Sequence, residues 1–169
     1  MPDTLKDQWG PYARLVPFET VAQQIEFARS CLPEEVRFLV PSLSLAKDGP
    51  VVETVFLITE KYLCEVRLKE NANDFDVSLL ATIGNYRVET DKQEITHEEA
   101  ASEKDAATES QVTKITYDTA KIRFVHTVNV ATDLTYVGEG RDDWIQQVFT
   151  AFPIDLLFKS RRERTNPSV

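Results

Sequence analysis

The sequence contains little cysteine and histidine and no long hydrophobic run, and each scarcity excludes a class of protein. Two cysteines and two histidines stand among 169 residues, and they form no group with aspartate that has the spacing of metal ligands. No apolar run approaches the roughly 18 residues that a membrane-spanning helix needs. The first residues, MPDTLKDQWGPYARLV, lack the apolar centre of a secretory signal. We therefore expect a cytoplasmic protein that carries no metal and no other cofactor.

The two cysteines stand in different kinds of segment. Cys31 falls in a helical pattern and Cys64 in a strand pattern, and no regular spacing relates them. We expect both to be small buried apolar side chains rather than the two halves of a disulfide.

Basic residues are scarce relative to acidic ones. Nineteen Lys and Arg stand against 28 Asp and Glu, which gives a formal net charge of −9 and a pI of about 4.8. Proteins that bind nucleic acid in general present a basic surface, and broad attraction to anionic membranes needs one too. The balance therefore argues against nucleic acid as a partner and weakens the case for general membrane binding.

Motifs of common catalytic sites are missing as well. The glycines at 138 and 140 precede an acidic helix start, which would repel a phosphate group. No G-x-S-x-G nucleophile motif occurs. His126 alternates with Ile122 and Phe124, which predicts a histidine on the inner face or rim of a sheet rather than a catalytic one. We expect no catalytic residue and no enzymatic activity.

The N-terminal third begins with a surface segment and a helix. Residues 1–16 are polar and contain Pro and Gly, so we expect them to lie on the surface. From Pro17 onward, apolar residues recur at spacings of three and four as far as Leu32, which predicts an amphipathic helix that ends at Pro33. Residues 1–35 are thus predicted to form an N-terminal segment that precedes the main domain.

Seven later segments have the pattern of β-strands. They are residues 36–45, 51–59, 62–68, 75–89, 112–118, 121–130 and 133–138. Gly84 is placed to bend the fourth strand or to hold a β-bulge, and the fifth and sixth strands are close enough to form a hairpin. Because most connections are short and contain no helix, we expect a mainly β fold, a seven-stranded antiparallel barrel-like sheet.

An acidic insertion interrupts this pattern at residues 91–111. It carries seven acidic residues and two lysines, a local net charge of 2 − 7 = −5, and almost no large apolar side chain. Thr96 followed by Glu99 could start a short helix by a capping box. We expect a solvated insertion, mobile or weakly helical, and an acidic arm for a basic partner is the alternative.

A second helix is predicted after Gly140. Asp142 and Asp143 suit its first turn, and Trp144, Val148 and Phe152 fall on one apolar stripe. A sheet that closes imperfectly leaves core exposed at its open end. We therefore expect Trp144 to insert between the two halves of the sheet.

The segments TVFLITEKYLCEV and LTYVGEGRDDWIQQVFTAF resemble the second and third strands and the last strand with its capping helix of the pleckstrin-homology (PH-like) superfold. The resemblance covers about residues 36–152, and it implies that Trp144 takes the place of a helix tryptophan that members often carry. It also implies a domain that binds phosphoinositides, peptides or other proteins rather than a catalyst.

Members that bind phosphoinositides place several cations around the first hairpin loop. The matching region here, SLAKDGPVVETVF, contains Lys47 but also Asp48 and Glu53. A polyphosphate headgroup needs several charge-assisted contacts, so we expect little headgroup binding through this loop.

The C-terminal residues 153–169 join an apolar run, Ile154 to Phe158, to a basic stretch. Within 159–169, Lys159, Arg161, Arg162 and Arg164 stand against Glu163, which gives 4 − 1 = +3. The apolar part could pack on the domain with the basic end solvated. Contact with an anionic membrane or partner, or pairing with the acidic insertion of the same or another copy, is the alternative.

The sequence thus favours a non-enzymatic interaction or scaffold domain that binds a protein. The candidate binding residues are Lys47 and the four cations of the C-terminal tail, Lys159, Arg161, Arg162 and Arg164. A peripheral membrane adaptor that contacts anionic lipid through the C-terminal tail is the alternative, and a small-molecule enzyme within the barrel is a third possibility. The partner is not identified, and a homo-oligomer is also open.

Overall fold

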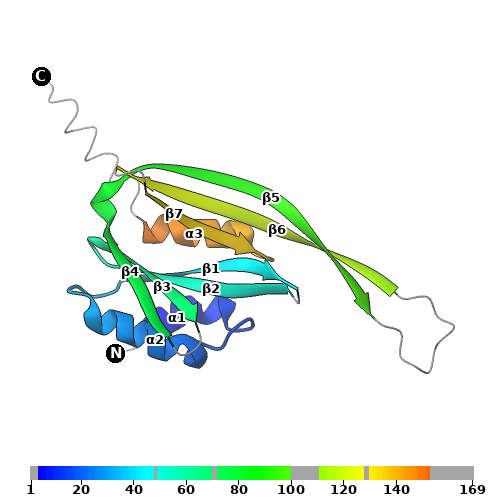
Figure 1. The fold of residues 1–169 in the computed structure, drawn as a ribbon, viewed down its shortest axis with the longest axis horizontal. Helices are drawn as coiled ribbons and strands as arrows, with labels where there is room; N and C mark the ends of the chain where they lie inside the picture. The colour runs from blue at the N-terminus through cyan, green and yellow to red at the C-terminus, as the bar shows by residue number, and fades with distance from the viewer. Residues whose placement is uncertain (1–3, 48, 70–71, 100–110, 128–129, 153–169) are drawn as a thin grey trace, which may run out of the picture.

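Two antiparallel sheets and three helices make up the described part of the chain (Figure 1). The computed structural model describes residues 4–47, 49–69, 72–99, 111–127 and 130–152. The first sheet has the order β1 (Phe38–Ala46), β2 (Gly49–Ile58), β3 (Tyr62–Lys69), β4 (Ala72–Leu79). The second has the order β5 (Ile83–Glu99), β6 (Gln111–His126), β7 (Ala131–Val137). The helices are α1 (Thr4–Trp9), α2 (Phe18–Cys31) and α3 (Arg141–Ala151), with 3-10 turns η1 (Gly10–Tyr12) and η2 (Leu80–Thr82).

The mainly β, antiparallel architecture with a C-terminal helix is therefore confirmed. Closure into one barrel-like sheet is not confirmed, because the strands fall into separate sheets of four and three. None of the described helices is both long and apolar enough to cross a membrane.

Two strand predictions were wrong, and the errors cancel in the strand count. The segment 75–89 is not one strand, because η2 divides it and the Leu80 N–H bonds to the Lys61 carbonyl at 2.8 Å as the chain passes between the sheets. Gly84 does lie at a β-bulge, since the register shifts between Ile83 and Asn85. The predicted hairpin within 112–130 is instead a single strand, β6, which continues through Thr119.

The acidic insertion was also interpreted wrongly at its two ends. Residues 91–99 continue β5, and β6 begins at Gln111, so Thr96 lies opposite Lys114 in a ladder and starts no helix. Residues 100–110 lie outside the described residues. The paired residues 91–99 and 111–118, here called the arm, extend beyond β7, whose pairing with β6 covers only Thr119–Val125 (Figure 1).

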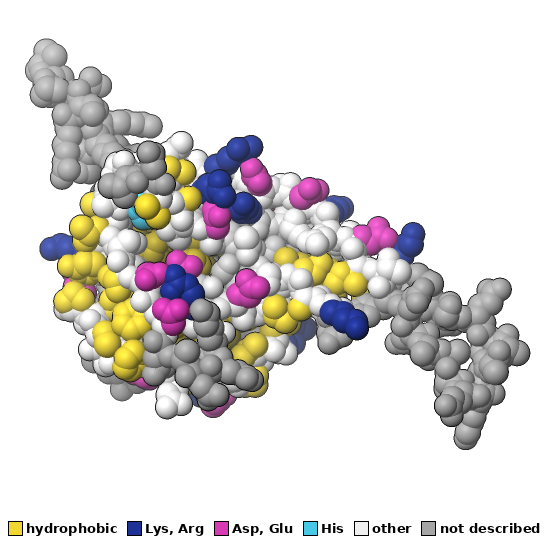
Figure 2. Space-filling view, in the orientation of Figure 1, with side chains coloured by type: hydrophobic (Ala, Val, Ile, Leu, Met, Phe, Trp, Pro, Cys, Tyr) yellow, Lys and Arg dark blue, Asp and Glu magenta, His cyan; other side chains and the backbone are white. Residues whose placement is uncertain are grey.

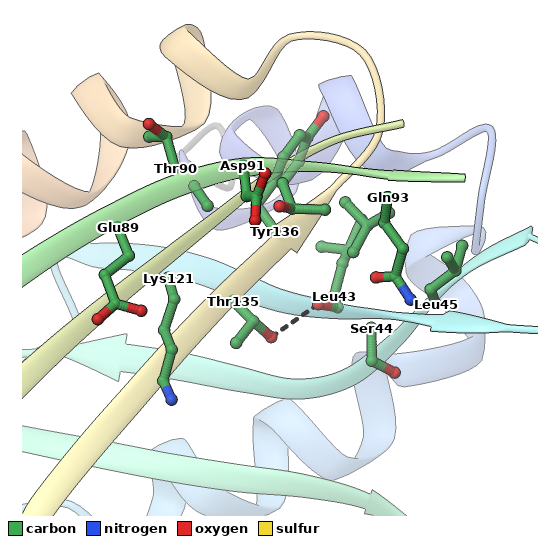
Figure 3. Close-up of a pocket in the computed structure, with 13 residues that line it drawn as sticks. Leu43, Ser44, Leu45, Glu89, Thr90, Asp91, Gln93, Lys121, Thr135 and Tyr136 are labelled. Atoms are coloured by element: carbon green, nitrogen blue, oxygen red, sulfur yellow. Dashed lines mark hydrogen bonds between the residues drawn. The ribbon is translucent and has the colours of Figure 1, made fainter. Parts of the chain in front are cut away.

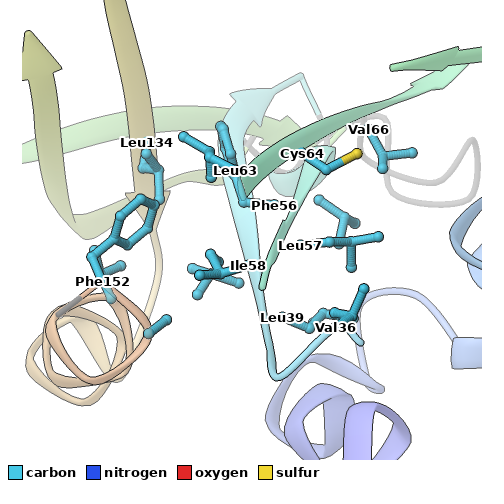
Figure 4. Close-up of a cluster of buried hydrophobic side chains, with 14 of the residues drawn as sticks. Val36, Leu39, Phe56, Leu57, Ile58, Leu63, Cys64, Val66, Leu134 and Phe152 are labelled. Atoms are coloured by element: carbon cyan, nitrogen blue, oxygen red, sulfur yellow. The ribbon is translucent and has the colours of Figure 1, made fainter. Parts of the chain in front are cut away.

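The first sheet is covered on both faces. The helices α1 and α2 lie against one face, and α3 lies between the other face and the second sheet (Figure 1). Alternation along the strands supplies apolar side chains to both faces. Leu57 and Cys64 lie on the face that α1 and α2 cover (Figure 4). The face towards α3 carries Phe56, Ile58 and Leu63.

The predicted helix after Pro17 is confirmed as α2, with Val21, Ile25 and Ala28 buried. The surface location predicted for residues 1–16 was wrong, because Trp9 is fully buried and its indole N–H donates to the Val16 carbonyl at 2.7 Å. Leu5 and Tyr12 are buried beside it.

The two cysteines differ in exposure. Both thiols are free, as expected, and Cys64 is buried. Cys31 is exposed, so its predicted burial was wrong: it is the last residue of α2, after the final buried position at Ala28.

Trp144 connects the two sheets, as the sequence predicted. The helix begins after Gly140, whose φ of 83° suits a residue without Cβ. Trp144 is 1% exposed, its ring stacks on Tyr136 of β7 with centroids 5.4 Å apart, and its indole N–H donates to the Pro41 carbonyl of β1 at 2.9 Å. A second connection lies nearby, where the Thr135 hydroxyl donates to the Leu43 carbonyl at 2.7 Å.

Candidate interaction site

The edges of the two sheets are not equivalent. The edge strands β1 and β7 lie against each other, and Thr135 donates its N–H to the Ser42 hydroxyl at 2.9 Å. Among the described residues, β4 and β5 each have a neighbouring strand on one side only. An open edge presents backbone N–H and C=O groups that can pair with another chain.

The side chains of β5 itself occupy part of its edge. The Tyr86 N–H bonds to Asn85 Oδ1 and the Lys92 N–H bonds to Asp91 Oδ1, both at 2.8 Å. These two N–H groups therefore point away from β6. Backbone groups two residues apart point to the same side of a strand, so the N–H and C=O groups of Val88 and Thr90 also face the open edge.

Hydrophobic side chains lie along the same stretch of β5. Tyr86 and Val88 are 40% and 38% exposed, although their cross-strand partners Phe124 and Ile122 are fully buried. The alternation thus continues the core face of the second sheet out to its edge. Natural edge strands usually carry charges that discourage pairing, so exposed apolar groups at this position indicate a surface that another segment can cover.

The helix α3 runs beside this edge in the opposite direction to β5. Its C-terminal half reaches Tyr86, whose ring meets that of Phe149 at 5.9 Å in an edge-to-face contact. Its first residue, Arg141, donates from Nη1 to the Asp91 carbonyl at 3.3 Å. Ile145 lies one turn before Phe149 on the same flank, and both side chains are only partly buried. We define the β5 edge site as Tyr86, Val88 and Thr90 of β5 with Ile145 and Phe149 of α3.

Acidic side chains lie within the stretch of β5 that forms the site and beyond it. Glu89, Asp91 and Glu94 are all exposed, and two of them have a cation nearby. Arg87 Nε lies 3.0 Å from Glu89 Oε1, and Lys114 Nζ lies 3.8 Å from Glu94 Oε1. Exposed pairs of this kind contribute little to stability and can exchange partners readily. A ligand that carries cations beyond its apolar residues would therefore find carboxylates in reach.

One cavity adjoins the β5 edge site. It has a volume of about 280 Å³ and lies between β1, β5, β6 and β7, and Thr90, Glu89 and Lys121 are among its lining residues (Figure 3). Another, of about 770 Å³, lies between η1 and the start of α3. There the Tyr12 hydroxyl donates to Gln147 Oε1, and burial raises the pKa of Tyr12, so the phenol stays protonated. Its role is to hold η1 against α3.

His126 is buried, as predicted, and has two hydroxyl partners. Its Nδ1 lies 2.7 Å from Thr82 Oγ1 and its Nε2 lies 2.9 Å from Thr132 Oγ1. Burial lowers the pKa of His126, because the charged ring would lose solvation. These contacts hold the end of β6 between η2 and β7.

Of the residues that the sequence suggested for binding, Lys47 alone is among the described ones. Lys47 is exposed in the turn between β1 and β2, and the cations of the tail, Lys159, Arg161, Arg162 and Arg164, lie outside the described residues. Within the described part of the chain, His, Cys, Asp and Glu side chains form no group of three that could hold a metal.

Sequence reasoning missed the β5 edge site. The alternation of Tyr86 and Val88 with Arg87 and Glu89 was a signal for a strand with one apolar face. That the strand is an edge depends on the strand order, which the alternation does not contain.

The remaining surface is mixed. Figure 2 shows acidic and basic side chains interspersed on the face in view, with hydrophobic side chains gathered towards the end of the molecule opposite the arm. Comparison of the chain with models of protein families, with characterised proteins and with solved structures gave no match.

Proposed function

We propose that the protein is a non-enzymatic interaction domain that binds an extended segment of a protein partner along the open edge of β5. The observation that carries the proposal is the coincidence, over residues 86–92, of outward backbone groups with the exposed side chains of Tyr86 and Val88. In binding by strand addition, main-chain hydrogen bonds supply affinity and pockets for alternate side chains supply specificity.

The chemistry of the site defines the segment it would accept. Alternate ligand residues would point towards Ile145 and Phe149, and they should be aliphatic or aromatic because those neighbours are apolar and partly exposed. Cations further along the ligand would be favoured by Glu89, Asp91 and Glu94. The ligand class is thus an extended peptide with alternating apolar residues followed by basic ones.

We also infer that the domain is a PH-like one. Support comes from the separate sheets of four and three antiparallel strands and from the helix that places Trp144 between them. The N-terminal helices and the arm are additions to that pattern.

A selection experiment tests the proposed function. Peptides selected from a random display library on the full chain are labelled, and their affinity is measured by fluorescence anisotropy. Val88→Lys should weaken binding by about tenfold or more, because it removes an apolar contact and places a charge in the β5 edge site. Val77→Lys is the matched control, since Val77 is 44% exposed on the other open edge strand, β4. Equal affinity for the two variants would contradict the proposal.

A peripheral membrane adaptor is the second candidate function. The observation that favours it is the joining of an apolar run to four cations within residues 153–169. Co-sedimentation with vesicles that contain phosphatidylserine, lost when Arg161 and Arg162 are changed to Glu and absent with neutral vesicles, would support it. The interaction domain alone predicts no sedimentation with either vesicle.

A further inference from the structure

The outer edge of β4 exposes apolar side chains. Val77 and Leu79 are 44% and 46% exposed, and among the described residues β4 has a neighbouring strand, β3, on one side only. Phe27 of α2 is 42% exposed beside the strand, and its ring meets that of Phe75 edge to face at 5.9 Å. A strand edge that exposes apolar groups in this way can pair with another chain.

The backbone groups of the same stretch point outward. The Leu80 N–H donates to the Lys61 carbonyl at 2.8 Å, and this pair continues the register of β4 with β3. Hydrogen-bonded pairs alternate along an antiparallel ladder, so the N–H and C=O groups of the even-numbered residues of β4 face β3. Those of Phe75 and Val77 therefore face the open edge, and their side chains lie on the face of the sheet that α2 covers.

Repulsion between carboxylates disfavours two registers for a second copy of the chain. Two identical strands pair antiparallel about a two-fold axis, so the residue at the axis lies opposite itself. An axis at Phe75 would place Asp74 opposite Asp76 of the second copy, and an axis at Asp76 would place two copies of this carboxylate together. Arg67 already pairs with Asp74 and Asp76 of its own chain, so one cation is shared between two carboxylates.

An axis at Val77 avoids this repulsion and matches apolar side chains. The opposed pairs are then Val77 with itself, Phe75 with Leu79 and Asp76 with Ser78. Phe27 extends the contact of Phe75 with Leu79 of the second copy, because its ring already meets Phe75. Moving the axis one residue further would leave Phe75 without a strand partner, since β4 ends at Leu79. The edge of β4 is therefore complementary to itself in this register.

We infer that the chain forms a two-fold homodimer in which β4 pairs with β4 of a second copy about Val77. The pairing joins the two four-stranded sheets into one sheet of 4 + 4 = 8 strands. Main-chain hydrogen bonds and the apolar contacts across the axis hold the dimer together. The β5 edge site belongs to the other sheet, so the dimer and the proposed peptide binding are independent and can fail separately.

Sedimentation equilibrium of the full chain tests the dimer. At a concentration of about 100 μM the wild type should have a mass of 2 × 19.2 = 38.4 kDa. Val77→Lys should weaken dimerisation by about tenfold or more, because two ammonium groups would meet at the axis. The matched control is Val51→Lys, the same change at a valine that is 39% exposed on β2, and it should remain a dimer.

A disulfide tests the register. The variants carry Cys31→Ser, which removes the exposed thiol. Val77→Cys should give a crosslinked dimer on oxidation, because residues opposed at the axis lie about 5.5 Å apart between Cα atoms, within reach of a disulfide. Leu79→Cys should not crosslink, because its two copies would be offset by four residues, about 14 Å along the strands.

Three outcomes would overturn the inference. The first is a mass of 19.2 kDa at every concentration. The second is a dimer that Val77→Lys leaves intact, or one that Val51→Lys also disrupts. The third is faster crosslinking of Leu79→Cys than of Val77→Cys. Binding of a selected peptide by the monomeric Val77→Lys chain, with wild-type affinity, would support the separation of the β4 interface from the β5 edge site.

Discussion

Replacement of Trp144 tests whether α3 joins the two sheets as the structure indicates. Trp144 is 1% exposed, stacks on Tyr136 and donates to the Pro41 carbonyl, so Trp144→Ala removes an aromatic contact and a buried hydrogen bond together. Truncation of a buried tryptophan to alanine costs about 3–5 kcal/mol. We expect a loss of that size in the free energy of unfolding, measured by urea titration with far-UV circular dichroism as the probe.

Two further variants separate the contributions. Trp144→Phe keeps a ring against Tyr136 but leaves the Pro41 carbonyl without its donor, which should cost about 1–3 kcal/mol. Gln146→Ala, at an exposed position of the same helix, should change stability by no more than about 0.5 kcal/mol. A loss below about 1 kcal/mol for Trp144→Ala would refute the conclusion that this side chain holds the sheets together.

Three other results are expected. Thr135→Val should destabilise the protein by about 1–3 kcal/mol in the same titration, because the Leu43 carbonyl of β1 loses its hydroxyl donor; an unchanged midpoint would exclude a role for this contact between the sheets. A thiol reagent should label the exposed Cys31 quickly and the buried Cys64 only after unfolding, because burial also raises the pKa of Cys64 to about 12. Rapid labelling of both cysteines would contradict the placement of Cys64 in the core. The lowered pKa of His126 means that the unfolded chain binds its proton more readily, so stability should fall as the pH drops below about 6.5, and His126→Gln should show a shallower slope if the assignment is right.

The helices show what local sequence can and cannot specify. The apolar pattern after Pro17 and the apolar stripe through Trp144 were sufficient to predict α2 and α3, because a long apolar face has one stable arrangement against a sheet. Leu5, Trp9 and Tyr12 also follow helical spacing, but Gly10 and Pro11 interrupt them within a few residues. So short a pattern becomes a helix only through the tertiary contacts that bury it.

The strands were harder to predict from the sequence where polar side chains occupy both faces. In the arm, charged and polar residues occupy both faces of β5 and β6, so the period of two that marks a half-buried strand is missing. Its stability comes instead from pairing across the hairpin, for example of Ile95 with Ile115, which no window of local sequence contains. The β5 edge site was unpredictable for a related reason, since the openness of an edge is a property of strand order.

Amide hydrogen exchange along β5 tests the central claim most directly. The measurement compares the full chain alone with the same chain saturated with a selected peptide, by nuclear magnetic resonance. Strand addition predicts that the amide protons of Val88 and Thr90, which face the open edge, become protected by about tenfold or more on binding. Unchanged exchange at these two amides while the peptide is bound would show that the partner binds elsewhere, and the assignment of function to the β5 edge would be wrong.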